Sequence, residues 1–102
     1  MLMAHIAIQS FNLTDEIITI CFEQDWFQDE ISELRQLLLN KIPNHEVKEI
    51  IHGADRENIR FKWQNTVFIM NFDYYSQSCW LNAQDEIGTS KIQPLFKLMT
   101  KN

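Results

Sequence analysis

Residues 59–72 read IRFKWQNTVFIMNF, and this stretch decides the fold. Apolar residues recur at every second position on both sides of Gln64-Asn65, which is the period of a β-strand with one buried face. Gln64-Asn65 has the length of a two-residue hairpin loop, and Asn tolerates the positive φ that such loops require. Side chains that face one another across this hairpin should therefore pack in the core. The expected pairs are Ile59 with Met70 and Phe61 with Phe68.

The reverse face of this hairpin pairs basic residues with apolar ones. Lys62 falls opposite Val67, and Arg60 falls opposite Ile69. Long basic side chains cover apolar neighbours while their charges reach water. One buried face and one partly wet face are typical of an antiparallel sheet with helices on one side.

Further strands are expected on both sides of the hairpin. Each is marked by a short apolar or alternating stretch between polar turn residues. Residues 12–16 are expected to connect the first two strands, and residues 75–77 to form a turn before the last. The six strands are expected at 5–11, 17–22, 46–52, 57–63, 66–74 and 78–84.

The first helix is predicted at residues 26–41, where apolar residues recur at helical spacing. Asp25 is expected to cap it, because Gln28 stands at the spacing of a capping box. A second helix is predicted at residues 91–100, and either a cap at Ser90 or a first turn that begins at Pro94 would start it.

The resulting order of elements is ββαββββα. Strand–helix–strand alternation, which is typical of doubly wound parallel sheets, does not run through the chain. We therefore expect an α+β fold, a two-layer sandwich in which a mostly antiparallel sheet carries two helices on one face. A chain of 102 residues has the usual size of one domain, so a single domain is expected over residues 1–102.

Charge is distributed unevenly around a net value of −5. Residues 1–34 contain acidic residues and no Lys or Arg, whereas residues 87–102 contain three lysines and no acidic residue. An acidic chain repels nucleic-acid phosphates and anionic lipids, so neither nucleic acid nor a membrane is expected as a partner. The charge polarity would suit a basic partner or self-association, although a solvated acidic face is the simpler interpretation.

The two cysteines, Cys21 and Cys79, form no metal-binding or disulfide pattern, and their apolar flanks favour burial as free thiols. The first residues lack the basic region of a signal peptide, and no apolar run approaches the length of a membrane span. These observations predict a cytoplasmic protein.

Patterns for ligands and catalysis are weak. With Gly53 and Gly88 alone, the chain cannot form a glycine-rich phosphate loop. His5, His45 and His52 lie far apart, and the clustered carboxylates near residue 25 have structural roles at a helix start, so neither a metal site nor a cofactor is expected. A nucleophile among Ser76, Ser78 and Cys79, with His52 as a base, is possible in principle; the apolar neighbours of Cys79 favour burial instead.

Residues 73–81, DYYSQSCWL, form the most unusual stretch. Aromatic side chains beside hydroxyl groups could line a pocket or an interface, or they could simply form a turn and part of the core. The candidate binding residues are Tyr74, Tyr75, Ser76, Ser78 and Trp80.

This stretch, continued as Asn82-Ala83, resembles a family of small uncharacterised bacterial proteins that carry a Tyr-Ser-x-Ser-x-Trp-Leu-Glu-Ala segment after a tryptophan-containing hairpin. Here Trp63 lies in the hairpin, and Asn82 replaces the Glu of the family. The resemblance implies a recurring domain and no particular activity.

The function is therefore not decided by the sequence. The leading hypothesis is a non-enzymatic protein-interaction module, which would act as a weak homo-oligomer or an adaptor through an exposed face or edge of its sheet. The alternative is a small-molecule-binding protein or a minor enzyme with a pocket near Tyr74–Trp80.

Overall fold

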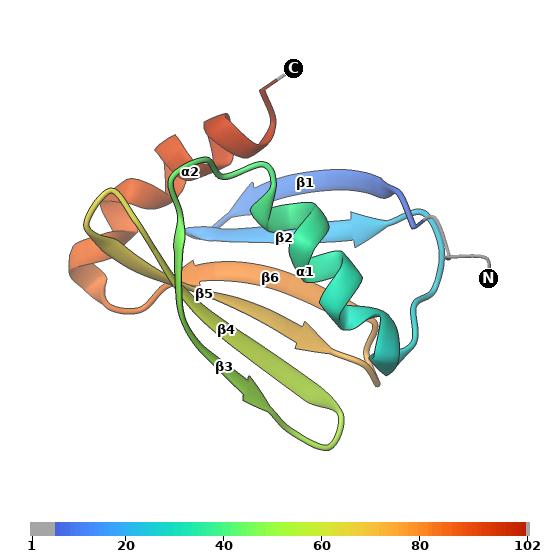
Figure 1. Ribbon diagram of the computed structural model, residues 1–102. Coiled ribbons are helices and arrows are strands. Elements are labelled where there is room, and N and C mark those ends of the chain that lie inside the picture. The colour runs from blue at the N-terminus through green and yellow to red at the C-terminus, as the bar shows by residue number, and fades with distance from the viewer. Residues whose placement is uncertain (1–5, 102) are drawn as a thin grey trace.

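Six antiparallel strands form one sheet in the order β1-β2-β6-β5-β4-β3, and two helices pack against it (Figure 1). The computed structural model describes residues 6–101. The predicted α+β fold and the order ββαββββα are confirmed. The strands are β1 (Ile8–Thr14), β2 (Ile17–Phe22), β3 (Glu46–His52), β4 (Arg56–Trp63), β5 (Thr66–Asp73) and β6 (Ser78–Ala83), the helices are α1 (Ile31–Leu39) and α2 (Ile92–Met99), and the 3-10 turns are η1 (Gln28–Glu30) and η2 (Glu86–Lys91).

The β4–β5 hairpin has the predicted register. Ile59 pairs with Met70, and Phe61 pairs with Phe68, whose ring centroid lies 5.7 Å away in a stacked arrangement. All four of these side chains are fully buried. Gln64 and Asn65 both have positive φ, 51° and 60°, as a two-residue loop of this kind requires.

The first hairpin differs from its prediction. β1 runs from Ile8 to Thr14, whereas the prediction placed the strand at 5–11; residue 5 lies outside the described residues. Only Asp15-Glu16 forms the loop, with φ of 51° and 64°, because the ladder continues through Thr14 and Ile17. A shift of register between Ile8 and Ser10 marks a β-bulge in β1.

One pairing joins strands that are not neighbours in the sequence. β2 pairs with β6 through Ile18–Leu81, Thr19–Trp80 and Ile20–Cys79. Every other pairing in the sheet joins consecutive strands. The β1–β2 hairpin is therefore attached to the four-stranded meander β3–β6 along this single seam.

The first helix starts later than predicted, and Asp25 does not cap it. η1 covers Gln28–Glu30 and leads into α1 at Ile31. The backbone N–H of Phe27 donates to Glu30 Oε1 at 2.8 Å, so the side chain of Glu30 satisfies the start of this segment. The cap predicted from the spacing of Asp25 and Gln28 is therefore wrong.

The segment before the second helix is the 3-10 turn η2. The carboxylate of Asp85 accepts from the Gly88 N–H at 3.1 Å and caps this turn. α2 then begins at Ile92, so neither predicted start, Ser90 or Pro94, is correct. Pro94 is the third helical residue, where a backbone N–H has no partner within the helix and its loss costs nothing.

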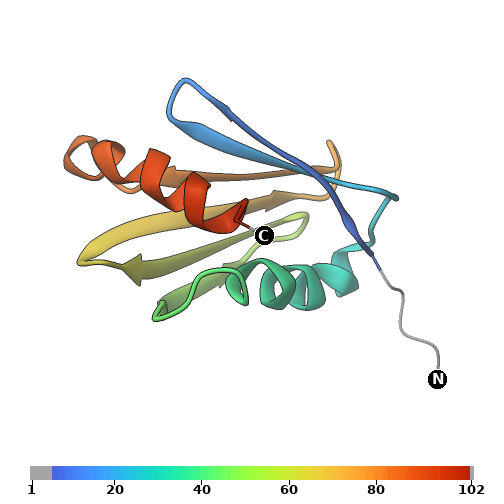
Figure 2. The ribbon, with the colours of Figure 1, turned by 90° about the horizontal axis from the view of Figure 1, so that it is seen from above.

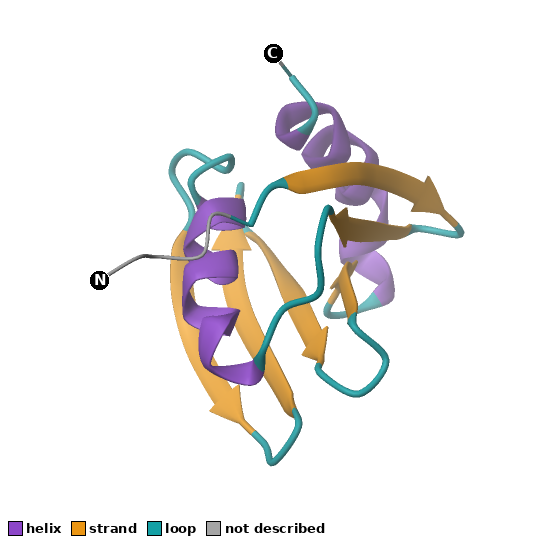
Figure 3. Cartoon of the chain, turned by 90° about the vertical axis from the view of Figure 1, so that its right-hand side faces the viewer, coloured by secondary structure: helices purple, strands orange, loops and turns teal. Residues whose placement is uncertain are grey.

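The core lies between the sheet and the two helices (Figure 2). The inward side chains of β2, β4, β5 and β6 join those of α1 and α2 in one buried cluster. Figure 3 shows α1 beside the β3–β4 part of the sheet, whereas α2 lies near β1 and β2. Within residues 6–101, neither helix has the length and apolar character to cross a membrane.

Replacing Glu16 by glycine should stabilise the protein. Glu16 has a φ of 64°, and an L-residue in this region is strained, whereas glycine is not. We expect Glu16→Gly to raise the free energy of unfolding by ~0.5–1 kcal/mol in urea denaturation. Glu23→Gly removes the same charge from a position without positive φ and should lower it; equal effects of the two variants would contradict the explanation.

Candidate functional site

The structure divides the predicted binding residues among three places. Tyr74 and Tyr75 line an open hollow of about 400 Å³. Ser76 and Ser78 bond to each other through their hydroxyl groups at 2.8 Å. Trp80 lies on the opposite face of the sheet, because strand residues alternate and its neighbour Cys79 points into the core.

The hollow near Tyr74 has aromatic walls. The buried ring of Trp26 packs edge-on against Phe72 at 5.8 Å and against Tyr74 at 6.3 Å. Phe27 and Tyr75 stand at its rim, and 64% and 81% of their surfaces are exposed. The hollow is therefore a shallow aromatic surface, and the hydroxyl groups of Ser76 and Ser78 are not part of it.

Gln77 holds this region together, although no local sequence pattern singles it out. Its side-chain Oε1 accepts from the backbone N–H of Trp26 at 2.9 Å. Its Nε2 donates to the backbone oxygens of Trp26 and Tyr74, both at 2.9 Å. One carboxamide thus ties the segment before α1 to the β5–β6 turn, 51 residues away.

The candidate nucleophile and base are far apart. Burial raises the pKa of the Cys79 thiol well above its usual value, and the nearby Cys21 adds to this effect, so Cys79 stays protonated at neutral pH. His52 lies on β3, three strand spacings or roughly 14 Å from β6. The expectation that both cysteines are buried is wrong for Cys21, which is exposed because it alternates with the inward Ile20.

A buried carboxylate lies beneath α1. Glu57 is 7% exposed, and its oxygens lie 2.6 Å from Arg35 Nη1 and 2.8 Å from His52 Nδ1. The guanidinium of Arg35 and the contact with the imidazole of His52 compensate the cost of burying this carboxylate. A hollow of about 450 Å³ opens beside it, lined also by Arg56. In the part of the chain that is described, no group of three or more His, Cys, Asp or Glu side chains could hold a metal ion.

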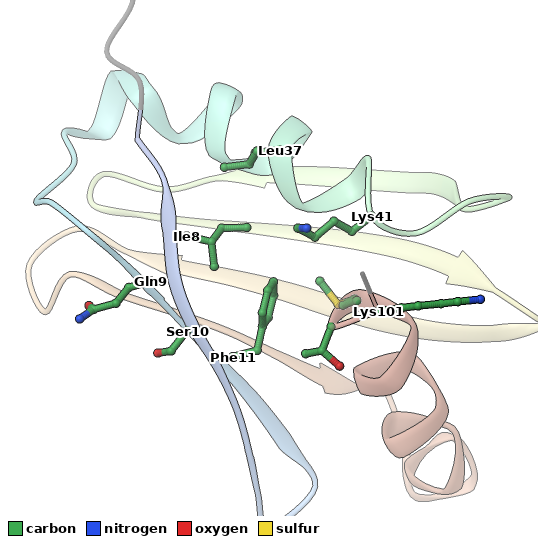
Figure 4. A pocket seen from close by; sticks show the side chains of 9 residues that line it. Ile8, Gln9, Ser10, Phe11, Leu37, Lys41 and Lys101 are labelled. Atoms are coloured by element: carbon green, nitrogen blue, oxygen red, sulfur yellow. The ribbon is translucent and has the colours of Figure 1, made fainter.

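A groove of about 510 Å³ lies where β1 meets the ends of both helices (Figure 4). Ile8 and Phe11 point from β1 into the space between Leu37 of α1 and the end of α2. Lys41 lies beside these apolar side chains, and Lys101 lines the end of the groove at the end of α2, where its ammonium group points away from Ile8 and Phe11 (Figure 4). The complete lining is Ile8, Gln9, Ser10, Phe11, Leu37, Lys41, Met99, Thr100 and Lys101.

The other face of the sheet carries no helix among the described residues. Trp80 lies near its centre, where it pairs with Thr19 on one side and Asn71 on the other. The side chains of Asn58, Asn71 and Asn82 form a chain of hydrogen bonds across three strands, with lengths of 2.7 Å and 2.9 Å. We call this surface the helix-free face, and its outward residues include Ile17, Thr19, Ile51, Asn58, Arg60, Ile69, Asn71, Trp80 and Asn82.

Loss of the Gln77 carboxamide should destabilise the fold. Gln77→Ala leaves the backbone N–H and oxygen of Trp26 without these partners in a partly buried place. We expect the free energy of unfolding to fall by about 2 kcal/mol in urea denaturation. Ser76→Ala, in the same turn but exposed, should change it by less than about 0.5 kcal/mol; a similar loss in both variants would show that the turn, and not the carboxamide, matters.

Comparison with known proteins places this chain in a family. No curated protein and no solved structure matches it. A family model described as "Protein of unknown function (DUF3630)" matches residues 6–99, which is nearly the whole chain. This match confirms the expectation of a recurring domain without an assigned activity. The chain belongs to the DUF3630 family of proteins of unknown function.

Proposed function

We propose that this protein is a non-enzymatic protein-interaction module that self-associates weakly through its helix-free face. The observation that carries this proposal is a six-stranded sheet that, within residues 6–101, presents one whole face without a helix, with Trp80 near its centre. Aromatic residues flanked by polar groups are enriched where proteins dock. The free thiols Cys21 and Cys79 suit a reducing cytoplasm, where we place this activity.

The polar groups in the middle of the face already have partners. Asn71 is only 8% exposed, and its Nδ2 donates to Asn82 Oδ1 at 2.9 Å while its Oδ1 accepts from Asn58. Burying a polar group is costly mainly when it loses its hydrogen bonds. A partner could therefore cover this chain of amides without breaking it.

Charge on this face is largely balanced within the chain. Arg60 Nε lies 3.0 Å from Glu49, and Arg56 lies 3.3 Å from Asp73. The acidic residues around the start of α1 belong to the other layer of the fold. A second copy would thus meet little repulsion here despite the net charge of −5.

The chemistry of the core favours a role in binding over catalysis. Cys79 is held as a thiol by its burial, and Glu57 is occupied by Arg35 and His52. Both groups thus have a structural role, whereas the residues of the helix-free face contribute little to the core. A role in binding another protein explains why Trp80 lies on the face of the sheet that no described helix covers.

Light scattering at two salt concentrations tests the proposal. We expect the mean mass to rise with protein concentration at both salts, because the charges on the contact surface are largely balanced within each chain. Thr19→Lys should weaken self-association by roughly tenfold or more, since Thr19 is exposed and pairs with Trp80.

Ser32→Lys is the matched control, because Ser32 is exposed on α1, away from the helix-free face. Its mass distribution should equal that of the unaltered protein. A strict monomer at both salts, or equal effects of the two lysine variants, would reject the proposal.

A further inference from the structure

The groove of Figure 4 combines an apolar floor with the edge of the sheet. Four consecutive residues of β1, from Ile8 to Phe11, form one wall. Ile8, Phe11 and Leu37 are only half-buried, although they belong to the inner layer of the fold. The inner side of β1 is thus left partly open between α1 and α2.

The edge of β1 has backbone groups that face away from β2. Among the described residues, β1 pairs with β2 alone. In a two-residue hairpin the closing pair, here Thr14 and Ile17, exchanges hydrogen bonds, and every second pair does the same. Phe11 and Leu13 fall between these pairs, so their N–H and C=O groups point to the free edge. Such groups are a template for one more strand.

The charge of the groove is opposite to that of the chain. Lys41 and Lys101 belong to its lining, and no carboxylate of the described residues lies within 4.0 Å of either ammonium group. An acidic occupant would pair with these two lysines, whereas a basic one would be repelled.

We propose that this groove binds an extended, acidic segment of a partner protein, which adds as a strand to the free edge of β1. Its apolar side chains would pack on Ile8, Phe11 and Leu37, and its carboxylates would approach Lys41 and Lys101. An apolar chain that ends in one carboxylate would bind more weakly, because it leaves the backbone groups of β1 unpaired and brings a single negative charge. This site is separate from the helix-free face, so it does not depend on self-association.

Fluorescence anisotropy with a labelled peptide of alternating Leu and Glu tests this site. We expect saturable binding that weakens several-fold as salt is raised to about 0.5 M. The double variant Lys41→Glu/Lys101→Glu should weaken binding at least about tenfold. Lys91→Glu/Lys97→Glu makes the same charge change on exposed residues outside the groove and should bind within about twofold of the unaltered protein.

Two further probes separate strand addition from other modes of binding. The same peptide with alternate backbone amides methylated should bind at least about tenfold more weakly, because it lacks donors for the edge. Dodecanoate should not displace the unmethylated peptide. Equal binding of the methylated peptide, displacement by dodecanoate, or equal effects of the two double variants would overturn the proposal.

The two proposals fail separately. Thr19→Lys should leave peptide affinity unchanged, and peptide should leave the mass measured by light scattering unchanged apart from its own. Urea denaturation of both double variants should give unfolding free energies close to that of the unaltered protein, because their charges lie at the surface. If the affinity for the peptide changed together with the oligomeric state, the peptide would bind at the helix-free face, and the proposal for the groove would be rejected.

Discussion

In the part of the chain that the structure describes, two short helices must keep the apolar face of a six-stranded sheet from water. Five strand spacings of about 4.8 Å make the sheet about 24 Å wide. α1 and α2 have nine and eight residues, so each is only about 13 Å long and about 10 Å across. They seal β2, β4, β5 and β6, whose inward side chains are buried, but they do not seal the edges. Every residue of β3 is exposed, and the inner side of β1 is half-buried. The groove beside β1 thus exists because the two helices are too short to cover the inner side of this edge strand.

The parts of the fold that depend on neighbouring residues could be predicted from the sequence. The β4–β5 register follows from a loop of two residues and a two-residue period, and both are local properties. β3 was predicted with its observed ends, Glu46 and His52, since Gly53 and the polar residues after it mark the turn. Cys79 was expected to be buried, and it is.

The error at the start of the first helix arose where a distant residue satisfies the backbone. Asp25 matched the spacing of a helix cap, but Gln77 takes the Trp26 N–H from across the fold, and Glu30 caps the turn instead. No local pattern reveals a carboxamide that acts over 51 residues. For the candidate site, in contrast, the sequence contained a usable pattern. Strand alternation puts Trp80 on the face opposite to Cys79, and Cys21 on the face opposite to Ile20. Alternation along β5 continues from Phe72 to Tyr74 on the inner side, whereas alternation along β6 puts Trp80 on the outer side, so Tyr74 and Trp80 are separated.

The seam between β2 and β6 sets the folding order of the molecule. Four of the five pairings close loops of only a few residues, so the β3–β6 meander gains its contacts at little entropic cost. Ile18 and Leu81, in contrast, come together only after 63 positions of chain are ordered between them. We therefore expect the β1–β2 hairpin to dock late and to detach early, so that hydrogen exchange would show its amides opening as a unit. Because this hairpin joins the rest of the sheet through one pairing, two molecules could exchange their β1–β2 hairpins. The β2–β6 seam is therefore the place where domain swapping would occur.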